Sequence, residues 1–174
     1  KNRKNGWVTE KIFRNYLEIK NQKDFKEVVK PSDNYSVKMA DPKDFQLNKF
    51  FYKKIGKNLQ WVDRLIWTDL NWINHVSNEN LFTYILKDND EIAGYFEILL
   101  SQNNKEAEIA YFGILEEYFG KKLGGYLLSE AIKQSFKMKS LRVWVHTCSL
   151  DHKYALGNYL SRGMKIFKSE TLIR

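Results

Sequence analysis

The chain is poor in cysteine and proline, with one cysteine, Cys148, and two prolines among 174 residues. A single cysteine cannot form an internal disulfide, and no cluster of cysteine and histidine has the spacing of a zinc site. We therefore expect no bound metal and a cytoplasmic protein. No apolar run has the length of a membrane-spanning helix, and the first residues lack the apolar segment of a signal peptide, so no membrane contact is expected.

What the chain does contain is charge and aromatic rings. Lysine and arginine number 29 against 21 aspartate and glutamate, which gives a net charge of +8 and suits a phosphate-bearing partner. Aromatic residues make up 15% of the chain, so the core should be rich in rings. The basic residues are dispersed among acidic ones and no nucleic-acid motif is present, so we expect no nucleic-acid partner.

Hydrophobic periodicity predicts a single domain over residues 1–174 with alternating strands and helices. Residues 8–19 are predicted to form one or two strands ahead of the main body of the domain. The further strands are expected at 37–40, 81–86, 92–100, 107–115, 141–147 and 164–168, and the helices at 42–56, 59–76, 121–138 and 151–163. Asp41 and Asp151 are the expected N-caps of the first and last helices.

The three strands between residues 81 and 115 are joined by the short turns "KDND" and "QNNK", which indicates an antiparallel meander. Helices alternate with the remaining strands. The sequence therefore predicts an α/β fold with a mixed, mainly antiparallel sheet flanked by helices.

The most informative stretch runs from the strand "AEIAYFGIL" through the loop "EEYFG" to the helix opening "KKLGGYLL". A glycine-containing turn between a strand and a helix presents unpaired backbone N–H groups at the positive end of the helix dipole, which favours a pyrophosphate. The spacing matches neither a Walker P-loop nor the dinucleotide fingerprint G-x-G-x-x-G.

Two segments resemble the GCN5-related N-acetyltransferase family. The first is "FGKKLG", Phe119 to Gly124, which is similar to the family's [Q/R]-x-x-G-x-[G/A] signature between a strand and a helix. The second is "HKYALGNYLSRGM", His152 to Met164, which is similar to its N-x-x-A-x-x-x-Y-x-x-x-G-F segment. The stretches "YFGILEEYFGKKLGGYLL" and "RVWVHTCSLDHKYAL" look like a bacterial subgroup of the family. The resemblance covers about residues 35–168, leaving 1–34 as an N-terminal strand extension.

Three residues depart from the family pattern. Phe119 replaces glutamine or arginine, Lys122 replaces the first glycine, and His152 stands where many relatives have asparagine. A lysine at position 122 costs about 1 kcal/mol only if its φ must be positive. We expect Lys122 to lie inside the first helical turn, where its ammonium can reach a phosphate.

The resemblance implies an acetyl-CoA-dependent N-acetyltransferase, with the strands at 107–115 and 141–147, the fourth and fifth of the family core, splayed apart to hold acetyl-CoA. Direct attack by a primary amine of a small molecule or a protein is the expected reaction. The alternative is an acyl-CoA-binding or interaction module of the same fold without turnover. The residues expected to bind the cofactor are Phe112, Gly113, Ile114, Gly120, Lys121, Lys122, Leu123, Gly124, Gly125, His152 and Tyr159.

Tyr159 matches the tyrosine of the second segment and is the expected proton donor to the CoA thiolate; the alternative is a core tyrosine. For the base, a two-residue turn at "NN" pairs Leu99 with Glu108 and Glu97 with Ala110, which places both glutamates on one sheet face. Glu108 is the preferred base and acts through water. The alternative is that both glutamates face solvent.

The acceptor is expected to contact Trp61, Arg64, Glu97 and His146. For the tryptophans on the helix predicted at 59–76, core packing or the interface of a homodimer is the competing interpretation. Cys148 could serve as a nucleophile with a neighbouring histidine, but a structural thiol is favoured. His75 is expected at the surface.

Overall fold

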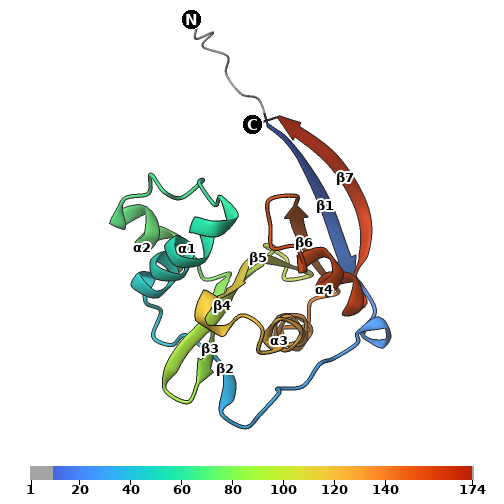
Figure 1. Ribbon diagram of the computed structural model, residues 1–174, viewed down its shortest axis with the longest axis horizontal. Coiled ribbons are helices and arrows are strands. Elements are labelled where there is room, and N and C mark those ends of the chain that lie inside the picture. Colours follow the sequence, from blue (N-terminus) through green and yellow to red (C-terminus); the bar gives the residue numbers. More distant parts are fainter. Residues whose placement is uncertain (1–9, 174) are drawn as a thin grey trace, which may run out of the picture.

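The computed structural model describes residues 10–173 and shows a seven-stranded mixed sheet with helices on both faces (Figure 1). Val8 and Thr9, the start of the first predicted strand, lie outside the described residues. The strands are β1 (Lys11–Ile19), β2 (Tyr35–Met39), β3 (Leu81–Asp88), β4 (Glu91–Leu100), β5 (Glu106–Ile114), β6 (Arg142–Cys148) and β7 (Lys165–Ile173). The helices are α1 (Phe45–Leu59), α2 (Asp69–Ser77), α3 (Leu123–Lys137) and α4 (Ala155–Ser161), with short 3-10 turns η1 (Gln22–Asp24) and η2 (Glu116–Tyr118).

The strands follow the order β2-β3-β4-β5-β6-β1-β7, so the N-terminal strand lies between the last two. All neighbours are antiparallel except β5 and β6. That parallel pair has only three partnered positions, the last of which joins Glu108 to Trp144. Beyond it the two strands separate, which confirms the mixed, mainly antiparallel sheet with a split between the fourth and fifth core strands.

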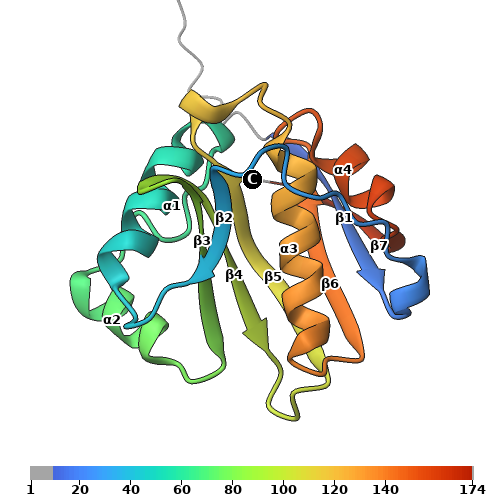
Figure 2. The same cartoon turned by 90° about the horizontal axis from the view of Figure 1, so that it is seen from below.

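The two faces of the sheet are covered differently, as Figures 1 and 2 show. α3 packs on one face, where Leu127 and Ile132 join Phe96 and Ile98 in the larger apolar cluster. On the other face, α1 packs Phe51 against the fully buried ring of Tyr95 at 4.8 Å between centroids, in a smaller cluster. Because both faces of β4 are covered, six consecutive residues, 93–98, are buried, whereas the edge strands β2 and β7 together contain one buried residue, Tyr35.

The single helix predicted over 59–76 is wrong. α1 ends at Leu59 and is capped by Gln60, which has a left-handed φ of 55°, and α2 begins only after Thr68. Thr68 and Asn71 form a capping box that starts a new helix, so residues 61–67 form a loop. The apolar residues of this loop were the source of the apparent helical pattern. Trp61 and Arg64 therefore project from a loop rather than from a helix.

The first and last predicted helices also differ at their ends. Asp44, and not Asp41, caps α1 by accepting a hydrogen bond from the Gln46 amide at 2.9 Å. Gly56 lies inside α1 rather than ending it. A Cβ at this position would lie 2.6 Å from Cβ of Trp61, so glycine allows the loop after α1 to pack closely. Asp151 does not cap α4, whose N-cap is Tyr154.

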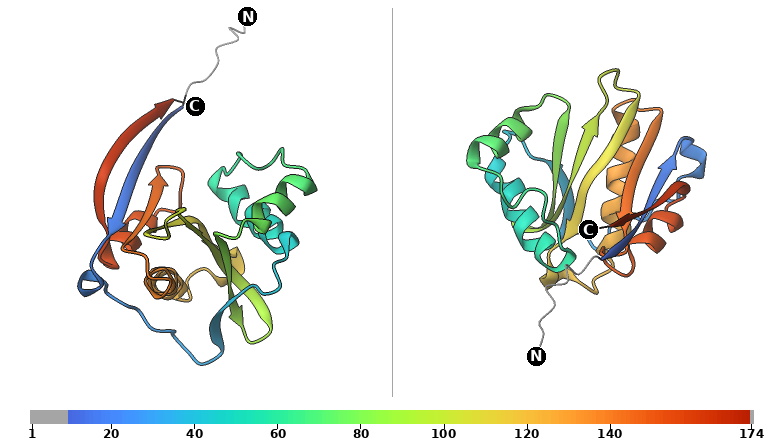
Figure 3. Two further views of the ribbon diagram at one scale, coloured as in Figure 1. Left: turned by 180° about the vertical axis from the view of Figure 1, so that it is seen from behind. Right: turned by 90° about the horizontal axis from the view of Figure 1, so that it is seen from above.

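The two outer strands, β1 and β7, curve away from the body of the domain as a ribbon (Figure 3). They pair over Lys11–Glu18 and Lys165–Ile173, so the final strand is longer than predicted.

In residues 10–173, no helix combines the length and apolar character needed to cross a membrane.

Candidate functional site

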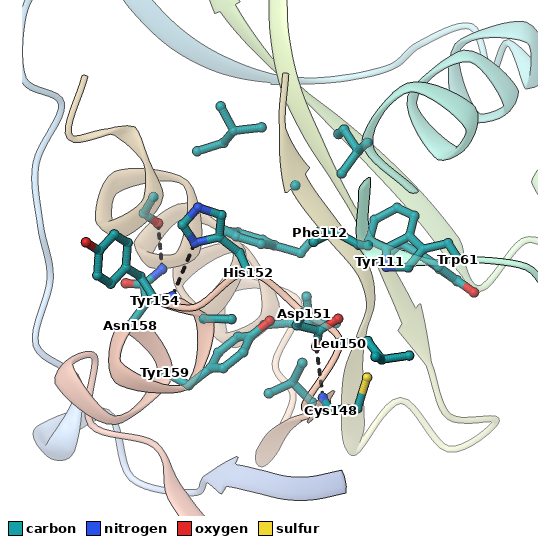
Figure 4. A pocket seen from close by; sticks show the side chains of 18 of the residues that line it. Trp61, Tyr111, Phe112, Cys148, Leu150, Asp151, His152, Tyr154, Asn158 and Tyr159 are labelled. Atoms are coloured by element: carbon teal, nitrogen blue, oxygen red, sulfur yellow. Dashed lines mark hydrogen bonds between the residues drawn. The ribbon is translucent and has the colours of Figure 1, made fainter. Parts of the chain in front are cut away.

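A cavity of about 1650 Å³ opens where β5 and β6 separate (Figure 4). Its walls come from β5, β6, the loop after α1, the N-terminal turn of α3, and α4. The predicted site residues that line it are Trp61, Arg64, Glu108, Phe112, Gly113, Ile114, Gly120, Lys122, Leu123, Gly124, Gly125, His146, His152 and Tyr159. The structure thus brings most of the predicted site together around one cavity.

The turn before α3 has an unusual backbone. Gly120 has φ of 76°, and no atom lies within 4 Å of the position of a Cβ there. Lys122 has φ of 61° and is the N-cap of α3, so the prediction that it lies inside the helix is wrong. A non-glycine residue in this conformation costs about 1 kcal/mol. Its side chain makes no capping hydrogen bond, which leaves the first amides of α3 without a side-chain acceptor.

α4 holds the opening of α3 through a residue that the sequence analysis missed. The Asn158 side chain donates a hydrogen bond to the carbonyl oxygen of Gly124 at 3.0 Å. One turn later, Arg162 lies so close over Gly125 that a Cβ on this glycine would be 2.4 Å from Nη1 of the arginine. Glycine at position 125 is therefore needed for the packing of Arg162 against α3.

Arg162 is a second missed residue. It lines the cavity, its Nε is buried without a hydrogen-bond partner, and it makes no ion pair within residues 10–173. Burial lowers the pKa of this guanidinium, and no neighbouring carboxylate opposes that effect. Arg162 precedes Gly163 at the end of the second family segment, but the sequence carries no signal that this arginine lacks a carboxylate neighbour. An unpaired cation beside the first turn of α3 suits an anion.

Lys121 does not belong to this group. Its ammonium lies 5.3 Å from the centre of the Tyr118 ring, near Asp88, and the residue does not line the cavity. Lys121 is thus set apart from the other residues predicted to bind the cofactor, and its contact with the cofactor stays a prediction. The exposed ring of Phe119 instead contacts His152 at 5.4 Å between centroids, and this pair bridges the two sides of the cavity mouth.

The register of the β4–β5 hairpin agrees with the prediction at one pair and differs at the next. Leu99 pairs with Glu108 as expected, but Glu97 pairs with Tyr111 rather than Ala110. The register shifts between Glu97 and Ile98, because Ala110 is an extra residue of a β-bulge in β5. The bulge lies beside the point where β5 and β6 separate.

Glu108 has the environment of a base. It is half-buried, lines the cavity, and has no hydrogen-bond or ion-pair partner in the described chain. Burial raises the pKa of this carboxyl, Arg64 opposes the shift, and Glu97 adds to it. The expected electrostatic link between the two glutamates is therefore present, although their side chains have different surroundings.

Glu97 is fully buried and does not line the cavity, contrary to the prediction that it contacts the acceptor. Its carboxylate accepts hydrogen bonds from Arg64 at 3.3 Å and from Asn48 at 2.9 Å, and lies 2.8 Å from Nε2 of His75. His75 is thus a partner of a buried carboxylate rather than a surface residue. Although burial opposes ionisation, these partners lower the pKa of Glu97 to about 2.

Arg64 is enclosed as tightly as Glu97. Its guanidinium carbon lies 4.1 Å from the centre of the Tyr111 ring and 4.8 Å from that of Trp67. Its backbone amide donates to the hydroxyl of Tyr52 at 2.9 Å. These contacts fix the loop 61–67 onto the sheet, so Arg64 shapes the cavity wall through its place in the fold.

Tyr159 projects from α4 toward the turn that carries Leu150 and Asp151 (Figure 4). Its side chain is almost fully buried but lines the cavity. Burial, and then the nearby carboxylate of Asp151, raise the pKa of Tyr159 well above its usual range. The phenol therefore keeps its proton at neutral pH and is able to donate a hydrogen bond into the cavity.

The environment of Cys148 favours a structural thiol. Burial, and then Asp151, raise the pKa of Cys148, which disfavours the thiolate needed for a nucleophile. Asp151 accepts hydrogen bonds from Oγ1 of Thr147 at 2.5 Å and from the Cys148 amide at 2.9 Å, so it terminates β6.

Within residues 10–173, no three histidine, cysteine, aspartate or glutamate side chains gather as metal ligands.

Residues 46–164 match the family described as the acetyltransferase (GNAT) family, and the chain belongs to that family. The match includes β5, the turn before α3, and α4, all of which line the cavity. It excludes β1, β2 and β7. No curated protein matches the chain.

Solved structures share the fold at low sequence identity. A GCN5-related N-acetyltransferase from Sphaerobacter thermophilus has a TM-score of 0.73 and 13% identity over 93% of this chain and 50% of its own. A conserved protein of unknown function from Staphylococcus epidermidis has a TM-score of 0.60 and 15% identity over 95% of this chain and 62% of its own. This chain thus spans between 50% and 62% of their length.

An aminoglycoside acetyltransferase from an uncultured soil metagenomic sample, in complex with trehalose, has a TM-score of 0.62 and 14% identity. The alignment covers 74% of this chain and 87% of that protein.

Proposed function

We propose that the protein is an acetyl-CoA-dependent N-acetyltransferase that moves an acetyl group to a primary amine by direct attack. The observation that carries the proposal is the single cavity that joins the α3 turn, Tyr159 and the unpaired carboxylate of Glu108. Family membership supports the cofactor, and the uncompensated Arg162 beside α3 supports an anionic ligand at that end.

The residues present fit coenzyme A in three respects. The amides from Gly120 to Gly125 and the guanidinium of Arg162 suit the phosphates. The free edge of β5 at residues 112–114 faces the split from β6, so its backbone is available to an extended amide-containing arm. Bound acetyl-CoA supplies an activated thioester carbonyl to the amine.

Glu108 accepts the proton that the attacking amine loses. Burial raises the pKa of the Glu108 carboxyl, which makes its carboxylate a stronger base than that of an exposed glutamate. A water between Glu108 and the amine would serve, because the carboxylate already faces the cavity without a partner.

Tyr159 acts at the leaving sulfur. Because burial holds its proton firmly, the phenol stabilises the departing thiolate chiefly as a hydrogen-bond donor. Direct transfer is favoured over an acetylated cysteine since the pKa of Cys148 is raised.

The test is to incubate the protein with acetyl-CoA and a panel of amines while free thiol is measured, and to measure CoA binding by titration calorimetry. We expect Tyr159→Phe to lower turnover far more than CoA affinity, and Cys148→Ala to leave turnover largely intact. Trapping of an acetyl group on Cys148 would refute direct attack. CoA binding without turnover of any amine would favour the alternative of a binding module.

A further inference from the structure

The ion pair of Arg64 and Glu97 lies next to the carboxylate that the proposed function uses as the base. Glu108 pairs with Leu99 across the β4–β5 hairpin, and Glu97 lies two residues before Leu99 on β4. Residues two apart in a strand share a face, so Glu97 and Glu108 lie on the same face of the sheet. Glu97 is fully buried there, whereas Glu108 and Arg64 line the cavity. Arg64 is thus the member of the pair that borders the same space as the base.

The guanidinium of Arg64 is held in one place. Both of its terminal nitrogens donate to the Glu97 carboxylate at 3.3 Å. Its central carbon lies 4.1 Å from the centre of the Tyr111 ring and 4.8 Å from that of Trp67. Tyr111 follows Glu108 on β5 by three residues. The Tyr111 ring therefore fixes the guanidinium against the strand that carries the base.

The strand on the other side of Glu108 brings no uncompensated charge. The residue of β6 that pairs with Glu108 is Trp144. Arg142, two residues earlier, is ion-paired with Glu18 and lies 3.6 Å from Glu106. The positive charge that β6 contributes at this end of the sheet is therefore already neutralised.

The remaining elements around the cavity carry titratable groups as well. Those that line it from the loop 61–67, α1, α2, β1 and β6 are Asp63, Lys54, His75, Arg14 and His146. Burial is the largest cause of the raised pKa of Glu108. Of the charged groups, Arg64 opposes the rise and Glu97 adds to it. The pair thus acts on the base through two effects of opposite sign.

The opposition of these two effects depends on the contact between Arg64 and Glu97. An isolated guanidinium beside Glu108 would stabilise the ionised carboxylate and make it a weaker proton acceptor. A guanidinium in contact with a carboxylate acts on a third charge as a dipole, so the two contributions largely cancel. The buried carboxylate therefore decides how much of the Arg64 charge reaches the base.

We propose that Glu97 is a positioning residue for the reaction: by neutralising Arg64, it prevents this guanidinium from weakening Glu108 as a proton acceptor. This inference rests on the proposed function, because it assigns the proton of the attacking amine to Glu108. Glu97 itself touches neither the amine nor the thioester, since it does not line the cavity.

The experiment measures the ionisation of Glu108 in two independent ways. The first is the dependence of kcat/KM for an amine on pH. The second is NMR of isotope-labelled glutamate carboxyls, in which the Glu108 signal is identified by its loss in Glu108→Gln. The variants are Glu97→Gln, Arg64→Met and the double variant with both changes.

Glu130→Gln is the matched control, because it also removes a carboxylate from an ion pair. Glu130 lies on α3, which packs on the opposite face of the sheet, and its carboxylate is 2.7 Å from the ammonium of Lys133. The loss of one negative charge is therefore the same as in Glu97→Gln, but at a site remote from Arg64.

We expect Glu97→Gln to move the midpoint of the Glu108 ionisation to lower pH by about one unit and to lower the plateau rate, because the Arg64 charge is then uncompensated. Arg64→Met should move the midpoint to higher pH, because the negative charge of Glu97 then acts alone. The double variant should return it close to the wild-type value, and Glu130→Gln should leave it unchanged. A purely structural role for Glu97 would lower the rate without moving the midpoint.

An unchanged midpoint in Glu97→Gln would overturn the proposal, as would shifts in the same direction in both single variants. If Arg64→Met does not fold, the double variant decides, because a midpoint as low as that of Glu97→Gln would show that the Arg64 charge is not the cause. If the NMR midpoints shift as expected but no amine is acetylated, the effect of Glu97 on Glu108 stands and the proposed catalytic function fails.

Discussion

Arg64 and Arg162 line the same cavity but have opposite electrostatic surroundings. Arg64, at the acceptor end, is buried and pairs with Glu97 through both of its terminal nitrogens. Arg162, at the cofactor end, is partly buried and has no carboxylate partner in the described chain. Although burial lowers the pKa of Arg64, the neighbouring carboxylate of Glu97 raises it further, so the net shift is upward. For Arg162, burial lowers the pKa and no carboxylate opposes it.

The difference separates a cation used by the fold from one left for a ligand. Arg64 holds the loop 61–67 in place. Because the Glu97 carboxylate neutralises the Arg64 guanidinium, this positive charge does not attract an anionic ligand. Arg162 carries an unneutralised charge at the first turn of α3, where the helix dipole also repels it. An anionic ligand would offset both the unneutralised charge of Arg162 and its repulsion by the helix dipole. We therefore expect substitution of Arg64 to affect stability and substitution of Arg162 to affect ligand binding.

The largest expected effect comes from breaking the buried pair. Arg64→Met leaves the Glu97 carboxylate buried with only His75 and Asn48, and should lower the free energy of unfolding by about 3–5 kcal/mol. Urea denaturation followed by tryptophan fluorescence measures this. The double variant Arg64→Met with Glu97→Gln removes the uncompensated charge and should recover part of the loss. A single variant as stable as wild type would contradict the assignment.

The Arg64–Glu97 pair also makes the free energy of unfolding depend on pH in the acidic range. Because the pKa of Glu97 falls from 4.5 to about 2 on folding, its stabilisation is complete above pH 4.5 and is lost as the pH falls toward 2. The linkage amounts to about 3 kcal/mol. Denaturation between pH 5 and pH 3 should show this dependence in wild type, and Glu97→Gln should remove that part of it.

The pH dependence of catalysis tests Glu108, the carboxylate that lines the cavity. If Glu108 is the base, the rate rises with pH through one ionisation whose pKa is above the usual value. Glu108→Gln should lower the rate by about a hundredfold or more and flatten this dependence. If Glu97→Gln, corrected for folded protein, removes the ionisation and Glu108→Gln does not, the assignment of the base is wrong.

Arg162→Gln should weaken CoA binding by about tenfold, the value of one charge-assisted contact, while the KM for the amine stays unchanged. Calorimetry at two salt concentrations should show a smaller salt dependence than in wild type. Lys165→Gln, on the exposed start of β7, is the matched loss of one positive charge. Equal effects of the two variants would mean that only net charge matters.

The smallest effect is expected at Lys122. Lys122→Gly should relieve the cost of the left-handed backbone and raise the free energy of unfolding by up to about 1 kcal/mol. Lys122→Glu keeps that cost but reverses the charge at the α3 turn, so it should weaken CoA binding. If glycine lowers stability instead, the backbone strain at this position is not significant.

Local sequence signals located one wall of the cavity well. The glycines and the strand, turn and helix pattern around residues 107–128 depend on neighbours in the chain, and the structure places them along one cavity wall. The conformation of Lys122 was not predicted, because a lysine in the sequence gives no indication of a positive φ. Arg162 escaped notice because its significance lies in the absence of a carboxylate nearby, which only the tertiary structure reveals.

The acceptor side was predicted less well, for a physical reason. Helical spacing of the apolar residues between 59 and 76 obscured the capping box at Thr68, so the loop was missed. The bulge at Ala110 changed the partner of Glu97, because register depends on a local backbone irregularity that spacing does not show. The bacterial subgroup, the homodimer and the cytoplasmic location stay predictions.

The sequence by itself determined the α/β class, the antiparallel meander and the turn that opens α3, because each depends on periodicity or on short-range backbone chemistry. Tertiary structure alone decided which charges are neutralised. Glu97 and Glu108 are eleven residues apart and near one sheet face, yet only Glu97 meets Arg64, Asn48 and His75 from α1, α2 and their connecting loop. Those partners come from distant parts of the chain, so they make one glutamate a buried anchor and leave the other facing the cavity.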